Sequence, residues 1–377
     1  YLKGGADTFN LLVPHSDCTG KDMNDEYQTV RAEVAMSKNQ LLQIDVPAGT
    51  QPCTKFGLHP DLDYLEELYE DGDGSFISNI GNLIEPITVA EYKAKTKQIP
   101  LGLVAHNTQV EHSQSVHPQA GDAKGVLGRI VGALTSQTDP YKTKSYSITG
   151  SMKIVEGPNP AEIISAKSGA VRLQAFDSQA NGRLGAPLLN MSSIESSTIF
   201  SETWSGLLES SLENTESLGA DLDAATVTET FDEESNLCNM LKQVAKIISL
   251  SQGDDSPLDS ERDVFVVNLG GFDAHSDLIE DFSANMRDLN GCVESFVKEI
   301  KRTPGLWDGV AITTLSDFGR TITSNGIGTD HGWGGNHILL GGSVSGGKIH
   351  GDYPDDLTEA GPQMLSRGRL IPTTPWE

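Results

Sequence analysis

The 377-residue sequence has few basic residues and no long hydrophobic run. Only 27 Lys and Arg stand against 53 Asp and Glu, so the formal net charge is −26. This shortage of cations argues against nucleic acid or an anionic membrane surface as a partner, because phosphate groups are bound by clustered Lys and Arg. No stretch approaches the roughly 18 consecutive apolar residues of a membrane-spanning helix, so we expect no membrane span.

Several common catalytic and nucleotide-binding motifs are also missing. There is no Gly-x-Ser-x-Gly turn, which argues against an ordinary serine-hydrolase triad. No Gly-x-Gly-x-x-Gly follows a predicted strand and no Walker loop occurs, so a nucleotide cofactor has no support. Residues 71–75 resemble the start of a calcium loop but lack the downstream glutamate of an EF-hand, and a tight turn is the simpler interpretation.

Cysteine is scarce, and the four residues are too widely spaced for a zinc knuckle or a CxxC redox motif. Cys18 and Cys53 flank a polar insertion that a disulfide would close, while Cys238 and Cys292 each lie beside a predicted helix and could form a second bridge. The even number fits an oxidising compartment. Four free buried thiols are the alternative.

Two further features agree with a secreted or extracellular protein. Asn190 begins the only Asn-x-Ser/Thr triplet and is the candidate glycosylation site. The chain opens abruptly at Tyr1-Leu2-Lys3, and we interpret it as a mature chain from which a leader has been removed.

What the sequence does contain is an alternation of strand and helix patterns. Residues 264–269 form a continuous apolar run typical of a strand buried on both faces. Apolar residues from Leu278 to Ile300 mark one face of a long helix, and residues 310–315 and 338–340 predict further strands. Strand, helix and strand with short connections indicate a right-handed crossover in a largely parallel sheet. We therefore expect an α/β fold with helices on both faces of the sheet.

The rest of the chain adds shorter elements and one irregular region. Residues 11–13 and 76–81 predict strands, and a helix is expected around residues 62–69. Residues 138–260 show weak periodicity, and no basic residue occurs between Arg183 and Lys242. We interpret this region as an acidic helical insertion within a single domain that spans residues 1–377.

Asp and His residues gather beside glycines where predicted strands end. In open α/β sheets, ligands bind beyond the carboxyl ends of the strands. Asp and His are typical ligands of zinc, manganese and related ions, and two such ions would clamp both oxygens of a phosphoryl or sulfuryl transfer. Structural turns are the alternative for each motif. The four turns are Gly4-Gly5-Ala6-Asp7, Gly270-Gly271-Phe272-Asp273-Ala274-His275, Ser316-Asp317-Phe318-Gly319-Arg320 and residues 328–337.

A second segment carries three histidines, His106, His112 and His117, beside hydroxyl residues such as Thr108. Taken singly, each is explained as a histidine in a polar surface loop. As a group they could supply a metal ligand, a general acid or an activated hydroxyl nucleophile.

These motifs resemble the family called domain of unknown function 1501 (DUF1501), a branch of the alkaline phosphatase and sulfatase superfamily. The resemblance is densest from Leu269 onward and spreads over nearly the whole chain. In that family the chain continues past the last motif with a further helix, so we expect that Glu377 is not the true end. The matching segments are Gly4-Gly5-Ala6-Asp7, Leu58-His59-Pro60, residues 103–109, Gly270 to His275, Ser316 to Thr321, Asp330 to Gly335, and residues 368–374.

The resemblance implies an alkaline-phosphatase-like three-layer α/β/α sandwich around a mostly parallel central sheet. Two positions depart from the family segment: Ala105 stands where the family has Ser, and Thr108 where it has Asp. Loss of a serine nucleophile at Ala105 would favour a catalytically degenerate protein, unless Thr108 takes its place. By analogy with superfamily metallohydrolases the metal ligands would be Asp7, Asp273, His275, Asp317 and His331, with Asp330 and His337 as second choices.

Two functions follow as hypotheses. The first is a secreted hydrolase of small phosphate or sulfate esters, dependent on divalent ions, with zinc first and calcium, magnesium or manganese as alternatives. In it Thr108 or a metal-activated water attacks, His106 assists proton transfer, and Arg320 neutralises the anionic ester, although a structural salt bridge explains Arg320 equally well. The second is a degenerate extracellular structural, cell-surface or assembly protein on the same fold, which binds calcium or a partner protein through its carboxylates.

Overall fold

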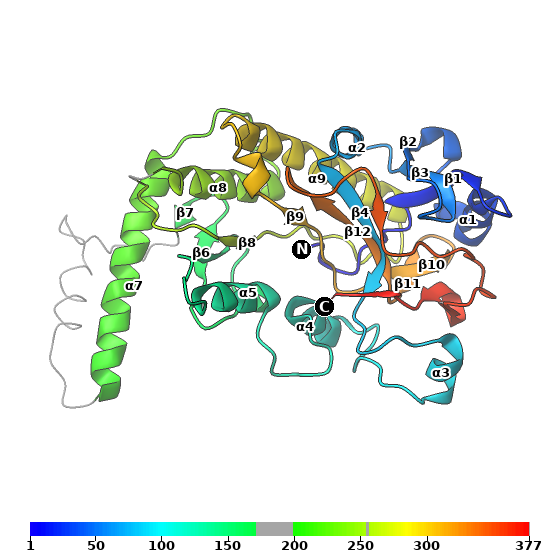
Figure 1. The fold of residues 1–377 in the computed structure, drawn as a ribbon, viewed down its shortest axis with the longest axis horizontal. Helices are drawn as coiled ribbons and strands as arrows, with labels where there is room; N and C mark the ends of the chain where they lie inside the picture. The colour runs from blue at the N-terminus through cyan, green and yellow to red at the C-terminus, as the bar shows by residue number, and fades with distance from the viewer. Residues whose placement is uncertain (171–198, 254–255, 377) are drawn as a thin grey trace.

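The computed structural model describes residues 1–170, 199–253 and 256–376, and it has a mixed α/β architecture (Figure 1). Asn190, the candidate glycosylation site, lies outside the described residues. Among the described helices, none combines the length and the apolarity that crossing a membrane requires.

Two sheets form the centre of the molecule. The larger has the order β13-β4-β12-β9, with β16 also paired to β4, and the smaller has the order β7-β6-β5-β8. In the larger sheet β12 is antiparallel to both β4 and β9, whereas β13 and β16 are parallel to β4. The sheets therefore mix both directions, and a mostly parallel arrangement holds only for β8, β5 and β6. The strands are β4 Gly74–Gly81, β5 Ser145–Ser147, β6 Glu162–Ser165, β7 Gly169–Ala170, β8 Val264–Val266, β9 Ile312–Thr313, β12 Gly335–Leu340, β13 Ile349–His350 and β16 Thr374–Pro375.

The first residues of the chain join these two sheets. Leu2 forms parallel bridges with both Leu269 and Ser316, which lie beyond the ends of β8 and β9. Its N–H donates to the carbonyl of Leu315 over 2.7 Å, and the N–H of Lys3 donates to Leu269 over 2.8 Å. The predicted strands at residues 264–269 and 310–315 therefore run in the same direction, as expected for a crossover. The two strands are not neighbours, however, because a segment from the opposite end of the sequence lies between them.

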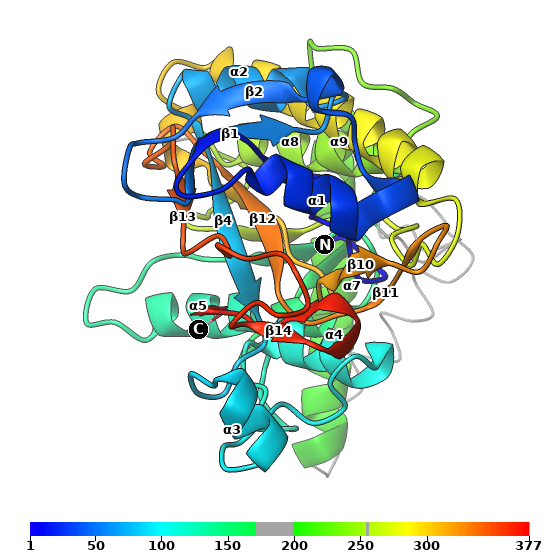
Figure 2. The same cartoon turned by 90° about the vertical axis from the view of Figure 1, so that its right-hand side faces the viewer.

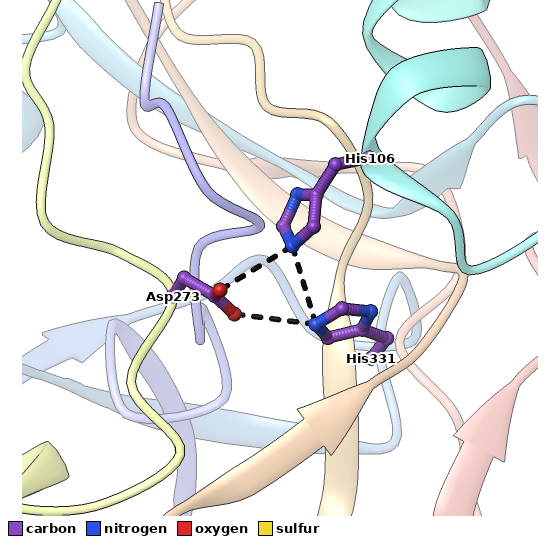
Figure 3. A group of neighbouring side chains, drawn as sticks. All are labelled: His106, Asp273 and His331. Atoms are coloured by element: carbon purple, nitrogen blue, oxygen red, sulfur yellow. Dashed lines mark hydrogen bonds and ion pairs between the residues drawn. The ribbon is translucent and has the colours of Figure 1, made fainter.

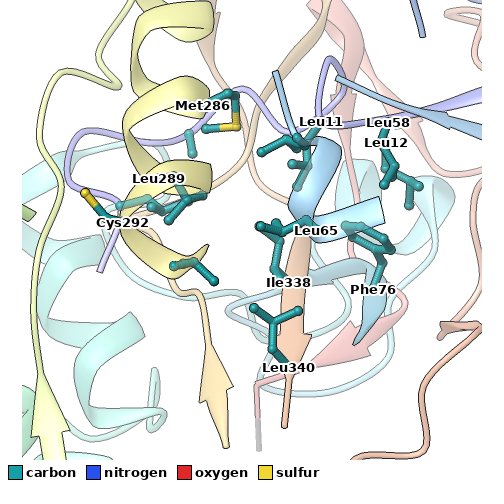
Figure 4. Close-up of a cluster of buried hydrophobic side chains, with 14 of the residues drawn as sticks. Leu11, Leu12, Leu58, Leu65, Phe76, Met286, Leu289, Cys292, Ile338 and Leu340 are labelled. Carbon is teal, nitrogen blue, oxygen red and sulfur yellow. The ribbon is translucent and has the colours of Figure 1, made fainter. Parts of the chain in front are cut away.

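Three helices pack together on one side of the sheets, and α4 and α5 lie toward the other side (Figure 1). Helix α9, Leu278–Lys301, matches the expected periodicity, and its buried face includes Phe282, Met286 and Phe296. Figure 4 shows Met286 and Leu289 of this helix in the same buried cluster as Leu65 of α2 and Ile338 of β12. The helices of these two groups are α2 Asp63–Glu70, α8 Asn236–Leu250 and α9, with α4 His106–Ser115 and α5 Val126–Thr135 opposite.

Both expected disulfides are present. Cys18 pairs with Cys53 directly across β1 and β3, in a three-stranded antiparallel sheet of order β1-β3-β2. Cys238 pairs with Cys292 and ties α8 to α9. The bounds in this part of the fold are β1 Leu12–Cys18, α1 Met23–Arg31, β2 Leu42–Asp45 and β3 Cys53–Leu58.

The region expected as a helical insertion is more closely integrated with the fold. Its described part contributes β5 and β6 to the sheet that contains β8, and α8 to the helical layer. These strands have only three and four residues, so no long apolar run predicts them. Helix α7, Ile199–Ala224, extends well beyond the body of the molecule (Figure 1), and the segment around α3 also lies at the periphery (Figure 2). The remaining helices and strands are α3 Val89–Ala94, β10 Arg320–Ser324, β11 Thr329–His331, β14 Met364–Leu365 and β15 Arg369–Leu370.

Candidate metal centre

Three histidine rings and one carboxylate converge where the chain leaves β8 and enters α4. Figure 3 shows His106, Asp273 and His331 pointing toward one another. His106 is the first residue of α4, Asp273 lies in the loop that follows β8, and His331 ends β11. His275, two residues after Asp273, completes the group. We call these four residues the histidine cluster.

The ligating atoms of the histidine cluster lie close together. The Nε2 atom of His331 is 3.2 Å from His106 Nε2, 3.0 Å from His275 Nε2 and 3.2 Å from Asp273 Oδ1. His275 Nε2 is 3.1 Å from Asp273 Oδ1, and His106 Nε2 is 3.4 Å from Asp273 Oδ2. Nitrogens bound to one tetrahedral zinc ion at roughly 2.0–2.1 Å lie about 3.3 Å apart. His106, Asp273 and His331 therefore suit a single divalent ion, and His275 lies beside two of them as a further candidate ligand.

Two of the rings are oriented by acceptors on their other nitrogen. His331 Nδ1 lies 2.8 Å from the carbonyl oxygen of Val104, which can only accept, so Nδ1 carries the proton and Nε2 presents a lone pair. His106 Nδ1 lies 2.8 Å from Asp317 Oδ2, which fixes the same tautomer. On the outer side of His275, Nδ1 lies 3.6 Å from Asp330 Oδ1. Oxygen acceptors behind imidazole ligands are the usual second contact in metal sites.

The protonation states also favour metal binding. Burial lowers the pKa of His331, which keeps its ring neutral at physiological pH. For Asp273, burial raises the pKa, but the hydrogen bond and charge of Arg320, with smaller contributions from His106 and His275, lower it more. Asp273 is consequently ionised. The side chains of Asp273 and His275 are each 48% exposed, so the histidine cluster is open to solvent on one side.

Asp317 is the buried carboxylate that contacts the His106 ring of the cluster. Its side chain is 2% exposed, and Oδ1 accepts hydrogen bonds from the Tyr1 hydroxyl over 2.7 Å and from the Gly4 N–H over 3.3 Å. Burial, together with the charge of Asp317, raises the pKa of the Tyr1 hydroxyl, so it stays a donor. Asp317 was expected as a ligand. In the structure one of its oxygens is committed to His106 and the other to Tyr1 and Gly4.

Tyr1 and Val104 were not among the residues singled out from the sequence. Tyr1 reaches Asp317 only because residues 1–3 lie between β8 and β9, a pairing that no local pattern reveals. Val104 has a φ of 65°, a left-handed conformation that is costly for a β-branched residue. Its carbonyl holds His331, so the strained turn before α4 serves the histidine cluster.

Three other expected ligands lie apart from the cluster or at its edge. Asp7 is buried, and its Oδ2 accepts hydrogen bonds from Arg31 over 2.9 Å and from Thr329 over 2.8 Å. His337 is also buried, where it contacts Thr314 Oγ1 at 3.1 Å, and burial lowers its pKa to about 3. Asp330 touches the cluster only through His275.

The expected catalytic residues have different positions. His106 belongs to the cluster itself, with its Nε2 directed at the ligating atoms. Arg320 is fully buried; it donates from Nη1 to Asp273 Oδ1 over 2.6 Å and from Nη2 to the Thr329 carbonyl. Thr108, in the first turn of α4, lies against Gly102. Of the neighbouring histidines, His112 contacts Gln109 and His117 contacts Arg129.

A second group of potential ligands, Cys238, Asp288 and Cys292, lies between α8 and α9. The two sulfur atoms are joined in a disulfide, and metal ligation by cysteine requires thiolates. This group therefore fits a covalent link between helices and not a metal site.

Comparison with known families supports part of the resemblance seen in the sequence. Residues 258–371 match the family model described as protein of unknown function (DUF1501). The matched segment contains three members of the histidine cluster, Asp273, His275 and His331. A comparison with curated proteins found no match.

Proposed function

We propose that this chain, given the DUF1501 match over residues 258–371, is a metal-dependent hydrolase of phosphate or sulfate esters. The observation that carries the proposal is the convergence of three imidazole Nε2 atoms and one carboxylate at a site open to solvent. The Nδ1 atoms of His106 and His331 are each held by an oxygen acceptor on the other side of the ring. Zinc is the first choice of ion because imidazole and carboxylate groups are among its usual ligands and its protein sites are commonly tetrahedral. Magnesium and calcium prefer sites made of oxygen ligands.

A bound divalent ion would supply Lewis acidity toward an oxygen of the ester. In this proposal the chain's own residues hold and orient that ion: His106, His275, His331 and Asp273 as ligands, and Asp317 as the acceptor that fixes the His106 ring. Arg320 keeps Asp273 ionised and aimed at the cluster. Since Thr108 lies against Gly102 and His106 serves as a ligand, we assign the attack to water and not to Thr108.

The proposal extends to four points that rest on resemblance. We propose that the chain belongs to the alkaline phosphatase and sulfatase superfamily and that its sheets and helices correspond to a three-layer α/β/α sandwich. We also propose that residues 1–377 form one domain and that the protein is secreted. Two disulfides support the last point, because such bonds persist in oxidising compartments.

The test compares hydrolysis of chromogenic phosphate and sulfate esters by the zinc-loaded wild type and by Asp273→Ala. We expect metal-dependent turnover in the wild type and a loss of about 100-fold or more in the variant, as for other groups that stabilise transition-state charge. Asp259→Ala is the matched control, because Asp259 is an exposed carboxylate before β8, at the opposite end of that strand.

Equal rates in the wild type and Asp273→Ala would overturn the catalytic proposal. Bound metal without turnover would instead favour a degenerate extracellular structural or assembly protein, in which the ion holds the fold together.

A further inference from the structure

Recognition of an ester anion requires a cation with free donors beside the histidine cluster. Arg320 does not offer them, because its side chain is 0% exposed and its guanidinium is bonded to Asp273 and Thr329. Arg369 donates from Nε to the carbonyl of His331 over 2.9 Å and is partly buried. Arg31 is buried against Asp7. The guanidinium groups of Arg320 and Arg31 are therefore buried and bonded within the fold, whereas Arg369 is partly buried and holds the strand of His331 through its Nε.

Arg367 differs from them in exposure and in contacts. Its side chain is 71% exposed, and its Nη1 lies 3.6 Å from Asp330 Oδ2. That separation is longer than an N–H···O hydrogen bond, and an exposed ion pair of this kind contributes little free energy. The other oxygen of Asp330 lies 3.6 Å from His275 Nδ1. The carboxylate of Asp330 therefore lies between the exposed guanidinium and the outer nitrogen of His275.

The turn that carries Arg367 is fixed to the strand that carries His331. Met364 and Leu365 pair with Leu370 and Arg369 in the β14–β15 hairpin. Arg367 has a φ of 65°, and Gly368 has a φ of 69° and lies against Thr323 of β10. The hydrogen bond from Arg369 to the His331 carbonyl therefore ties this hairpin to the histidine cluster, and the Arg367 side chain on its turn is exposed.

We propose that Arg367 is the residue that recognises the substrate, by exchanging its long contact with Asp330 for a tetrahedral oxyanion held at the histidine cluster. The inference rests on the proposed function and adds a substrate-binding residue to it. A guanidinium presents paired donors that match phosphate and sulfate oxygens, and releasing an exposed ion pair costs little. Its positive charge would also oppose, close to the site, the repulsion of an anionic substrate by a chain whose net charge is −26.

Binding of inorganic phosphate and of sulfate to the zinc-loaded full chain, measured by titration calorimetry, tests this role without requiring turnover. The variants are Arg367→Met, Arg367→Lys and the matched control Arg287→Met. Arg287 is 68% exposed and also pairs with an aspartate, Asp61, but it lies on α9. Zinc content is measured first for each protein, and we expect it to be equal in all four.

We expect Arg367→Met to weaken anion binding about tenfold, the size of one charge-assisted contact at a solvent-exposed site. Arg367→Lys should retain part of the affinity, because the ammonium group keeps the positive charge but lacks the paired donors of the guanidinium. Arg287→Met should bind as the wild type does. Tighter phosphate than sulfate binding would assign phosphate esters as the substrate class, and the reverse order would assign sulfate esters.

Unchanged affinity in Arg367→Met, or an equal loss in Arg287→Met, would overturn the inference. Failure of the wild type to take up zinc would contradict the metal centre instead. The same titrations on the zinc-free chain would then test the role of Arg367. A loss of anion affinity confined to Arg367→Met would support that role, and an absence of anion binding by the wild type would reject it.

Discussion

The two most firmly anchored imidazoles of the histidine cluster are oriented through their Nδ1 atoms, and the groups behind them come from distant parts of the chain. Asp317 holds His106, and the Val104 carbonyl holds His331. Both contacts select the tautomer whose Nε2 has a lone pair. Tyr1 in turn holds Asp317. The site is thus preorganised by side chains that would not themselves touch the ion.

We expect Asp317→Asn to weaken zinc binding by about 10-fold to 100-fold with little change in fold, because the amide keeps the shape but loses the charge that favours the correct His106 tautomer. Chelator competition measures the affinity, and Asp259→Asn serves as the control. An affinity equal to that of the wild type would show that Asp317 does not act through His106.

His337 provides a prediction about acid stability. Its pKa is about 3 in the folded chain, against 6.5 for an unperturbed histidine, because the ring is buried. Between these values the unfolded chain binds a proton that the folded chain does not, so the free energy of unfolding falls as the pH drops from about 6.5 toward 3. The slope from this one group is at most about 1.4 kcal/mol per pH unit.

Urea unfolding from pH 7 to pH 4 measures this effect. We expect His337→Asn, which can still bond Thr314, to show a shallower loss of stability on acidification than the wild type. Parallel pH dependences in the two proteins would show that another group is responsible.

At the scale of single elements, the sequence predicted long periodic segments well and short ones poorly. Helix α9 could be predicted because apolar residues recur at helical spacing over its 24 residues. Strand β9 has only two residues, and β12 pairs antiparallel to both neighbours. Strand direction depends on where the chain returns, which periodicity does not encode. The same limit explains why residues 1–3 between β8 and β9 were not foreseen.

The candidate site was predicted in part for a related reason. Asp273, His275 and His331 were recognised because glycine-rich turns beside strands carry them. His106 was assigned to proton transfer, with a ligand role left open for the histidines of its segment, and only the fold brings its Nε2 to His331. Asp7 looked equivalent to the other turn aspartates. Its partner Arg31 lies on α1, 24 residues away, which local sequence does not reveal.

The disulfide between α8 and α9 ties the less regular middle region to the core, and its loss should be costly. We expect the Cys238→Ser, Cys292→Ser double variant to lose about 2–5 kcal/mol of unfolding free energy, because the bridge closes a loop of 54 residues. Guanidinium unfolding under non-reducing conditions measures this. The Cys18→Ser, Cys53→Ser variant is the comparison, with a separation of 35 residues. Stability equal to that of the wild type would show that packing alone holds α8 on α9.

For the whole molecule, the acidic charge divides into two unequal parts. Most carboxylates are surface groups, including those of α7, which contains no Lys or Arg. A few lie at the site: Asp273 is a candidate ligand, and Asp317 and Asp330 lie behind imidazole rings. Asp7 lies apart from the cluster and pairs with the buried Arg31. Because the surface charge opposes anionic ligands, the function proposed for this site would depend on local cations, namely a metal ion at the histidine cluster and the exposed guanidinium of Arg367.

The most direct test of the metal centre is the zinc content of the intact chain after loading and removal of free ion, measured by elemental analysis. The account predicts close to one zinc per chain in the wild type and in Asp259→Ala, with occupancy lost in His331→Ala, whose Nε2 lies within 3.2 Å of three other ligand atoms. Wild-type protein that retains no zinc, or that retains as much as His331→Ala, would contradict it.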